Sequence, residues 1–128
     1  MPEMEKLTLN VNPVDLGQIE LLVEQGFYAN RAEFIRVAIH DQLGKHADTV
    51  RETSVRLAYV IGAMVVDRQQ LEKTRKANRK LALRVVGFLG LADDVTPELA
   101  RAAIESVKVH GILKASKPVK AALADRMK

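Results

Sequence analysis

A short polar–apolar alternation near the N-terminus constrains this chain more than any other feature. Residues 5–11 read EKLTLNV, which places Leu7, Leu9 and Val11 on one face and Lys6, Thr8 and Asn10 on the other. A period of two predicts a strand with one buried face. The residues that follow predict helices, so this strand has no neighbouring strand with which to pair. Its backbone groups require a partner from elsewhere.

Two helices with clear start signals follow the predicted strand. Asn12 is a good N-cap, Pro13 suits the first helical position, and Gly26 can end the helix with a positive φ. Asn30 is expected to cap the second helix, and Glu33 stands three residues later, as in a capping box. The sequence therefore predicts strand, helix, tight turn and helix in that order.

This N-terminal unit ends near Gly44 and is too small to form a stable core alone. A second copy solves both problems, because two strands can pair across a two-fold axis while four helices share one core. The apolar residues expected in that dimer core are Leu7, Leu9, Val11, Phe34, Ile35 and Ile39. We therefore expect an intertwined homodimer.

The predicted order resembles the ribbon-helix-helix family, which includes the Arc, MetJ and CopG-type regulators. The resemblance covers about residues 5–44 and is carried by KLTLNV, NPVDLGQIELLVEQG and GFYANRAEFIRVAIHDQL. Members of that family insert their paired strands into the DNA major groove as a two-stranded antiparallel ribbon. The resemblance implies a sequence-specific transcriptional regulator, a repressor or autoregulator, that binds double-stranded DNA as a homodimer.

The resemblance also implies which residues contact DNA. The outward strand side chains would read base edges, and these are Lys6, Thr8 and Asn10. The start of the second helix would hold a phosphate through Asn30, Arg31 and Ala32. One departure is the charge of residues 1–44, which hold three basic and seven acidic residues. An acidic module attracts DNA phosphates weakly. The alternative interpretation is that the polar face of the strand is simply exposed to solvent and contacts no DNA.

A weak internal repeat follows in the second half of the chain. Gly62, Gly87 and Gly111 are spaced by 25 and 24 residues and lie within the runs YVIGAMVV, VVGFLGLA and VHGILKAS. Each run is followed by a helical candidate, namely DRQQLEKTRKANRK, TPELARAAIES and KPVKAALADRM. This spacing resembles leucine-rich-type β-α repeats with short parallel strands and open sheet edges. The alternative is one helix over 48–80, which the helix-breaking Gly62 disfavours.

The expected fold class is therefore α+β, with three parts. Residues 1–44 form the DNA-binding and dimerisation domain, residues 45–54 a polar linker, and residues 55–128 the repeat region. The repeat region is strongly basic, with 17 basic and nine acidic residues beyond position 44. Its basic cluster could bind DNA phosphates or acidic partners, or it could simply be a solvated helix face. The cluster comprises Arg68, Lys73, Arg75, Lys76, Arg79, Lys80 and Arg84. Open sheet edges make this region a candidate for oligomerisation, and it could also bind an effector.

Nothing in the sequence predicts an enzyme, a metal site or a cofactor. The chain has no Cys, and its three histidines, His40, His46 and His110, lack metal-ligand spacing. Asp93 and Asp94 precede a helix start and are expected to form a turn. No apolar run is long enough to span a membrane and no secretion signal is evident, so a cytoplasmic protein is expected. The alternative functions are an antitoxin, whose tail neutralises a toxin, and a DNA-associated assembly protein.

Overall fold

A computed structural model of the chain describes residues 4–127. These residues divide into two compact units, one over residues 4–52 and one over residues 53–127. Helices and strands are both present, as the expected α+β class requires. Among residues 4–127, no helix combines the length and the apolar character needed to cross a membrane.

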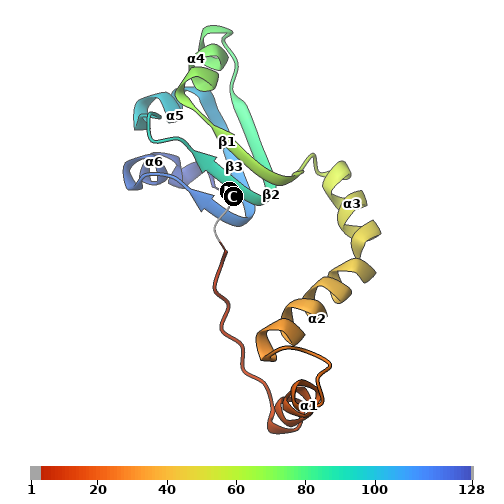
Figure 1. Ribbon diagram of the computed structural model, residues 1–128. Helices are drawn as coiled ribbons and strands as arrows, with labels where there is room; N and C mark the ends of the chain where they lie inside the picture. The colour runs from red at the N-terminus through yellow and green to blue at the C-terminus, as the bar shows by residue number, and fades with distance from the viewer. Residues whose placement is uncertain (1–3, 128) are drawn as a thin grey trace. The chain divides into compact units, whose positions relative to one another are not determined.

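The first unit begins with an extended segment and not with a paired strand. Residues 4–12 are drawn as an extended trace that leads into helix α1, Pro13–Glu24 (Figure 1). The predicted strand over residues 5–11 is therefore absent from the single chain, and the β-α-α order is not confirmed. The physical reason is that a strand needs a hydrogen-bonding neighbour, and the remaining elements of this unit are helices.

The start and the end of α1 are as predicted. The Asn12 side chain accepts a hydrogen bond from the Asp15 N–H at 2.9 Å, and Pro13 is at the first helical position. Gly26 follows the C-cap with a φ of 85°. The Asn12 side chain thus provides a hydrogen-bond acceptor for an N–H of the first turn, which has no partner within the helix. At the other end, the chain leaves the helix at Gly26, because glycine readily adopts a positive φ.

Helix α2, Arg31–Lys45, departs from the prediction at both ends. Asn30 caps it by accepting from the Glu33 N–H at 2.8 Å, but the Glu33 carboxylate accepts from the Ala29 N–H, one residue earlier than a capping box requires. Gly44 does not end the helix, because the intrahelical hydrogen bonding continues through Lys45. Helix α3, Ala47–Arg56, then occupies most of the segment expected to be a linker.

The second unit is a three-stranded parallel sheet with helices along one side. Strands β1 (Val60–Val66), β2 (Leu81–Leu91) and β3 (Ile104–Lys114) lie in sequence order. Helices α4 (Arg68–Lys76), α5 (Pro97–Ala103) and α6 (Lys117–Leu123) follow the three strands in turn (Figure 1). This confirms the predicted β-α repeat and excludes a single helix over residues 48–80.

The three repeat glycines lie side by side in the sheet. Gly62 is paired with Gly87, and Gly87 with Gly111, and all three have φ between 126° and 135°. A Cβ on Gly87 would overlap the carbonyl oxygen of Gly62, and a Cβ on Gly111 would overlap that of Gly87. Only glycine fits the second and third positions, because both the backbone angle and the close approach of the neighbouring strand exclude a side chain.

The side of the sheet that faces the helices is a closed apolar core. Its members come from all three strands, from the turn after β2 and from all three helices. The fully buried side chains of largest volume are Leu71, Leu89, Ile104, Leu123, Val85, Val107 and Val119. Because helix and strand residues are buried together in each repeat, this unit forms its core without a second chain.

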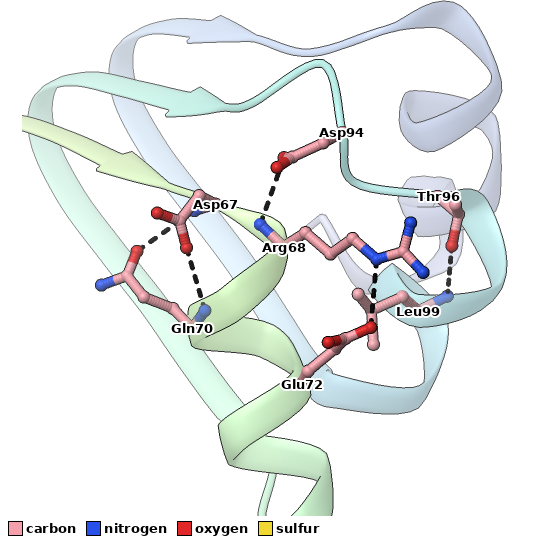
Figure 2. A network of polar contacts seen from close by, with 7 residues as sticks. All are labelled: Asp67, Arg68, Gln70, Glu72, Asp94, Thr96 and Leu99. Carbon is pink, nitrogen blue, oxygen red and sulfur yellow. Dashed lines mark hydrogen bonds and ion pairs between the residues drawn. The ribbon is translucent and has the colours of Figure 1, made fainter.

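The turns between strands and helices are fixed by polar contacts (Figure 2). Asp67 and Gln70 form a complete capping box at the start of α4, and Thr96 caps α5 by accepting from the Leu99 N–H. The Asp94 carboxylate accepts from the Arg68 N–H at 3.2 Å, which ties the turn after β2 to the turn after β1. As expected, Asp93 and Asp94 lie in a turn. The Asp94 carboxylate stabilises this turn through its hydrogen bond with Arg68.

The C-terminal end of the second unit is locked onto the last repeat. Arg126 donates hydrogen bonds to the carbonyl oxygens of Arg101 and Ile104. Arg101 in turn donates to the Ala122 carbonyl and pairs with Asp125, whose pKa this hydrogen bond lowers below its usual range. Met127 forms a parallel bridge to Val107 on the outer side of β3.

Two predicted boundaries in the second unit were wrong. The helix expected over residues 96–106 ends at Ala103, and Ile104, which is fully buried in the core, begins β3. The helix expected over residues 67–80 ends at Lys76. Asn78 there adopts a positive φ of 57°, which turns the chain toward β2.

Candidate DNA-binding interface

The three residues expected to read DNA are solvent-exposed in the N-terminal segment. Lys6, Thr8 and Asn10 all lie in the extended residues 4–12. Together they offer an ammonium, a hydroxyl and a side-chain amide, the donor and acceptor groups that contact base edges in the major groove. The structure brings them onto one short segment but does not test what they contact.

The N-terminus of α2 has the geometry of an anion site only in part. Asn30 is in an extended conformation and uses its side chain to cap the Glu33 N–H. The Arg31 guanidinium lies 3.8 Å from the Glu20 carboxylate, and both side chains are more than half exposed. Such an exposed ion pair is weak. Ala32 is exposed beside it.

The residues expected in the dimer core line a broad apolar hollow instead of a closed core. The hollow has a volume of about 740 Å³ and includes all six predicted residues, Leu7, Leu9, Val11, Phe34, Ile35 and Ile39. Leu7 and Leu9 are 79% and 63% exposed, and Ile39 is 43% exposed. Ile19 is the one apolar residue that the described part of this unit buries. The unit therefore leaves most of its apolar surface open.

The hollow also includes residues from the apolar helix faces that were not named among the expected dimer-core residues. Ile19 and Leu22 line it from α1, and Ala38 lines it from α2. The helical spacing of Leu16, Ile19 and Leu22 predicts such an apolar face on the first helix. The two helices thus present one continuous apolar surface with the N-terminal segment.

The basic residues of the second unit are not one free cluster. Arg68 is paired with Glu72 at 3.0 Å, a hydrogen bond that lowers the Glu72 pKa, and Arg84 donates to the Leu57 carbonyl at 2.9 Å. The remaining members of the cluster lie exposed on α4 and the turn after it. Within residues 4–127, no group of His, Asp and Glu residues has a metal-binding arrangement.

The comparison with known proteins points to a class of DNA-binding proteins. A family model described as the Ribbon-Helix-Helix transcriptional regulator family matches residues 2–120. The chain is also similar to the transcriptional regulator CdrS of Halobacterium salinarum strain NRC-1, with 36% identity over 45 residues. That match covers 35% of this chain and 82% of the relative. No solved structure matches the chain.

The protein is thus a transcriptional regulator by class, and it belongs to the ribbon-helix-helix transcriptional regulator family. Members of this family bind DNA and usually form dimers. The matched range reaches residue 120, so it includes all three strands of the second unit as well as the helices of the first. The assignment agrees with the expectation of a transcriptional regulator.

Proposed function

We propose that the protein is a sequence-specific regulator, a repressor or autoregulator, that reads the DNA major groove with a ribbon formed by two copies of residues 5–11. The observation that carries this proposal is the apolar hollow of about 740 Å³. It is lined by Leu7, Leu9 and Val11 together with both helices, so the apolar side chains of the segment and of the helices border one open space that a second copy can fill. Lys6 and Asn10 are exposed and do not line this hollow, whereas Thr8 stands at its border.

A second copy completes this arrangement. The two extended segments pair antiparallel, and the helices of both copies close over the apolar side chains. Lys6 then donates to guanine, Asn10 pairs with adenine, and Thr8 touches either a base edge or a thymine methyl group. The start of α2 holds a backbone phosphate with the free N–H groups near Asn30 and Ala32 and with the Arg31 side chain.

The folded second unit favours this function over that of an antitoxin. Toxin-neutralising tails are typically disordered when free, whereas residues 53–127 contain an apolar core that draws on all three repeats. The acidic residues of the first unit are also compatible with DNA binding. Asp15, Glu20 and Glu24 all lie on α1, the helix that in the resembling family faces away from DNA.

The test is footprinting on the protein's own upstream DNA, followed by binding measurements with variants. Lys6→Ala or Asn10→Ala should each weaken binding to the mapped site by about 1–3 kcal/mol and relax one base preference. Arg31→Ala should weaken binding to all sequences alike and reduce the salt dependence, because it removes a phosphate contact.

Leu21→Ala is a matched control, since Leu21 is 56% exposed on α1 and does not line the hollow. Its affinity and its salt slope should equal those of the unmodified protein. The ribbon proposal is wrong if the triple variant Lys6→Ala, Thr8→Ala and Asn10→Ala binds the mapped site with unchanged affinity.

A further inference from the structure

The second unit ends in two sheet edges of different character. On the β3 side, Met127 already bridges to Val107, and Arg126 fastens the C-terminal turn to the last repeat. β1 forms the other edge, and in the described chain it pairs only with β2. One edge therefore carries its own terminating contact and the other does not.

The outer backbone groups of β1 point away from its partner strand. The Gly62 carbonyl lies against Gly87 of β2, and the Val66 carbonyl accepts from the Ala92 N–H at 2.9 Å. In a parallel pair, alternate residues direct their backbone groups to the same neighbour. The groups of Ala63 and Val65 are therefore directed to the open side, where a further strand can pair with them.

This edge also lacks the features that usually prevent association. The strand reads VIGAMVV, with no charged residue and no proline. Val60, Ile61 and Val65 are 47%, 55% and 61% exposed. Natural edge strands are commonly protected by charges, prolines or a covering segment. An uncharged, apolar and exposed edge is typical of a strand that acquires a partner.

Gly62 shows that a backbone can approach closely here. Its φ of 134° is nearly the same as that of Gly87, whose missing Cβ makes room for the carbonyl of the preceding strand. At Gly62 the corresponding position has nothing within 4 Å. The open side of Gly62 therefore has room for the backbone of another strand to approach closely.

We propose that β1 pairs antiparallel with β1 of a second copy of this chain and joins the two sheets into one of six strands. A second copy fits better than a head-to-tail continuation, because the β3 edge is partly occupied by Met127. Pairing of like edges about a two-fold axis is closed and does not propagate into a filament. The proposal rests on the proposed dimer, which brings a second copy of the chain close. Because each second unit is then tethered to the other through the dimer, their effective concentration is about millimolar.

The test uses engineered cysteines in the full chain, which has no Cys of its own. Ala63→Cys and Val65→Cys each place a thiol on the edge strand. Phe88→Cys and Ile112→Cys are matched controls, because they place a thiol on the same face of the sheet but on β2 and β3. Under mild oxidation without DNA, at least one edge variant should form a disulfide-linked dimer and both controls should stay reduced.

A second measurement uses charge. Adding Val65→Lys to the Ala63→Cys variant should slow cross-linking several-fold, since a charged side chain on an edge strand opposes its pairing with another strand. Ile112→Lys in the same background should leave the rate unchanged. The pairing is wrong if neither edge variant links, if Phe88→Cys links as fast, or if Ala63→Cys links only when combined with Ile112→Cys.

The outcome is separable from that of DNA recognition. Edge variants that fail to cross-link but bind the mapped DNA site normally would overturn the β1 pairing alone. Loss of base recognition in the Lys6 and Asn10 variants does not enter the cross-linking result. A cross-linked protein whose strand trio reads no DNA would overturn the ribbon and leave the sheet pairing intact.

Discussion

The two units of this protein solve the problem of burying apolar surface in different ways. Residues 53–127 enclose a core within one chain, with Leu71, Val85 and Leu89 fully inaccessible to solvent. Residues 4–52 bury only Ile19 among their described apolar residues and leave an open hollow of about 740 Å³. Both units have well-formed helix caps, so local structure does not explain the difference.

The difference lies in whether each unit contains enough helices and strands to cover its own apolar surface. In the second unit every strand is followed by a helix that covers it, so each repeat contributes both sides of its own core. The first unit has one extended segment and two helices that cannot cover it on both sides. A complete core in this unit therefore depends on a second chain, whereas the repeats depend only on their neighbours.

The largest expected effect separates the two units by breaking the first. Leu9→Asp should abolish dimerisation and unfold residues 4–52, because the proposed ribbon would bury an unpaired carboxylate. The second unit should keep its fold. Each unit contains one of the two tyrosines, Tyr28 and Tyr59, so tyrosine resonances in NMR spectra report the units separately.

The control for this variant is Leu21→Asp, at a position that is similarly exposed but lies outside the hollow. It should remain dimeric by sedimentation. If Leu9→Asp also remains a folded dimer, Leu9 is as exposed in solution as it is in the single chain, and the contrast between the units disappears.

A smaller effect is expected within the second unit, at its glycines. Gly87→Ala should destabilise the sheet by more than about 3 kcal/mol, because it adds steric overlap with the Gly62 carbonyl to the strain of a positive φ. Gly62→Ala has the same strain and no overlap, so about 1–3 kcal/mol is expected. Urea unfolding followed at Tyr59 measures both, and equal losses would contradict the close strand approach.

The smallest effect concerns pH and the C-terminal turn. The hydrogen bond from Arg101 holds the Asp125 pKa below its usual range. A carboxyl group with a lowered pKa in the folded state stabilises that state above its unfolded pKa of about 4. This contribution is lost as the pH falls through the lower folded pKa. The Asp125 side chain is largely exposed, so the loss should be slight.

Acid unfolding of the unmodified protein and of Asp125→Asn measures this contribution. The variant should be less stable than the unmodified protein at neutral pH, and the difference should vanish in acid. Tyr28 in the first unit should report no difference at any pH. A stability gap that persists in strong acid would mean that the side chain acts by packing and not by its charge.

Much of the fold was predictable because its signals are local. Asn12, Asn30 and Gly26 mark helix ends through contacts within a few residues of sequence, and all three act in the structure as predicted. The spacing of the repeat glycines predicted their alignment in a parallel sheet. Such features need no knowledge of distant partners.

The errors lie at element boundaries and in one polar segment. Ile104 begins a strand and is fully buried in the core, although its sequence neighbours favour a helix. Residues 47–54 were expected to be part of a polar linker, and they lie in α3. The candidate DNA contacts at Lys6, Thr8 and Asn10 stay a prediction, because they depend on a second chain and on DNA.

The glycine column also limits how a gene for such a protein can change in length. Each added strand must place a glycine opposite the preceding carbonyl, as Gly87 and Gly111 do. An insertion inside a strand would put a side chain at that position, whereas the unequal spacings of 25 and 24 residues show that the connections between strands can differ in length by one residue. Duplication of a whole repeat would preserve the alignment. The sheet can therefore lengthen by whole repeats, with the adjustment in length confined to the connections.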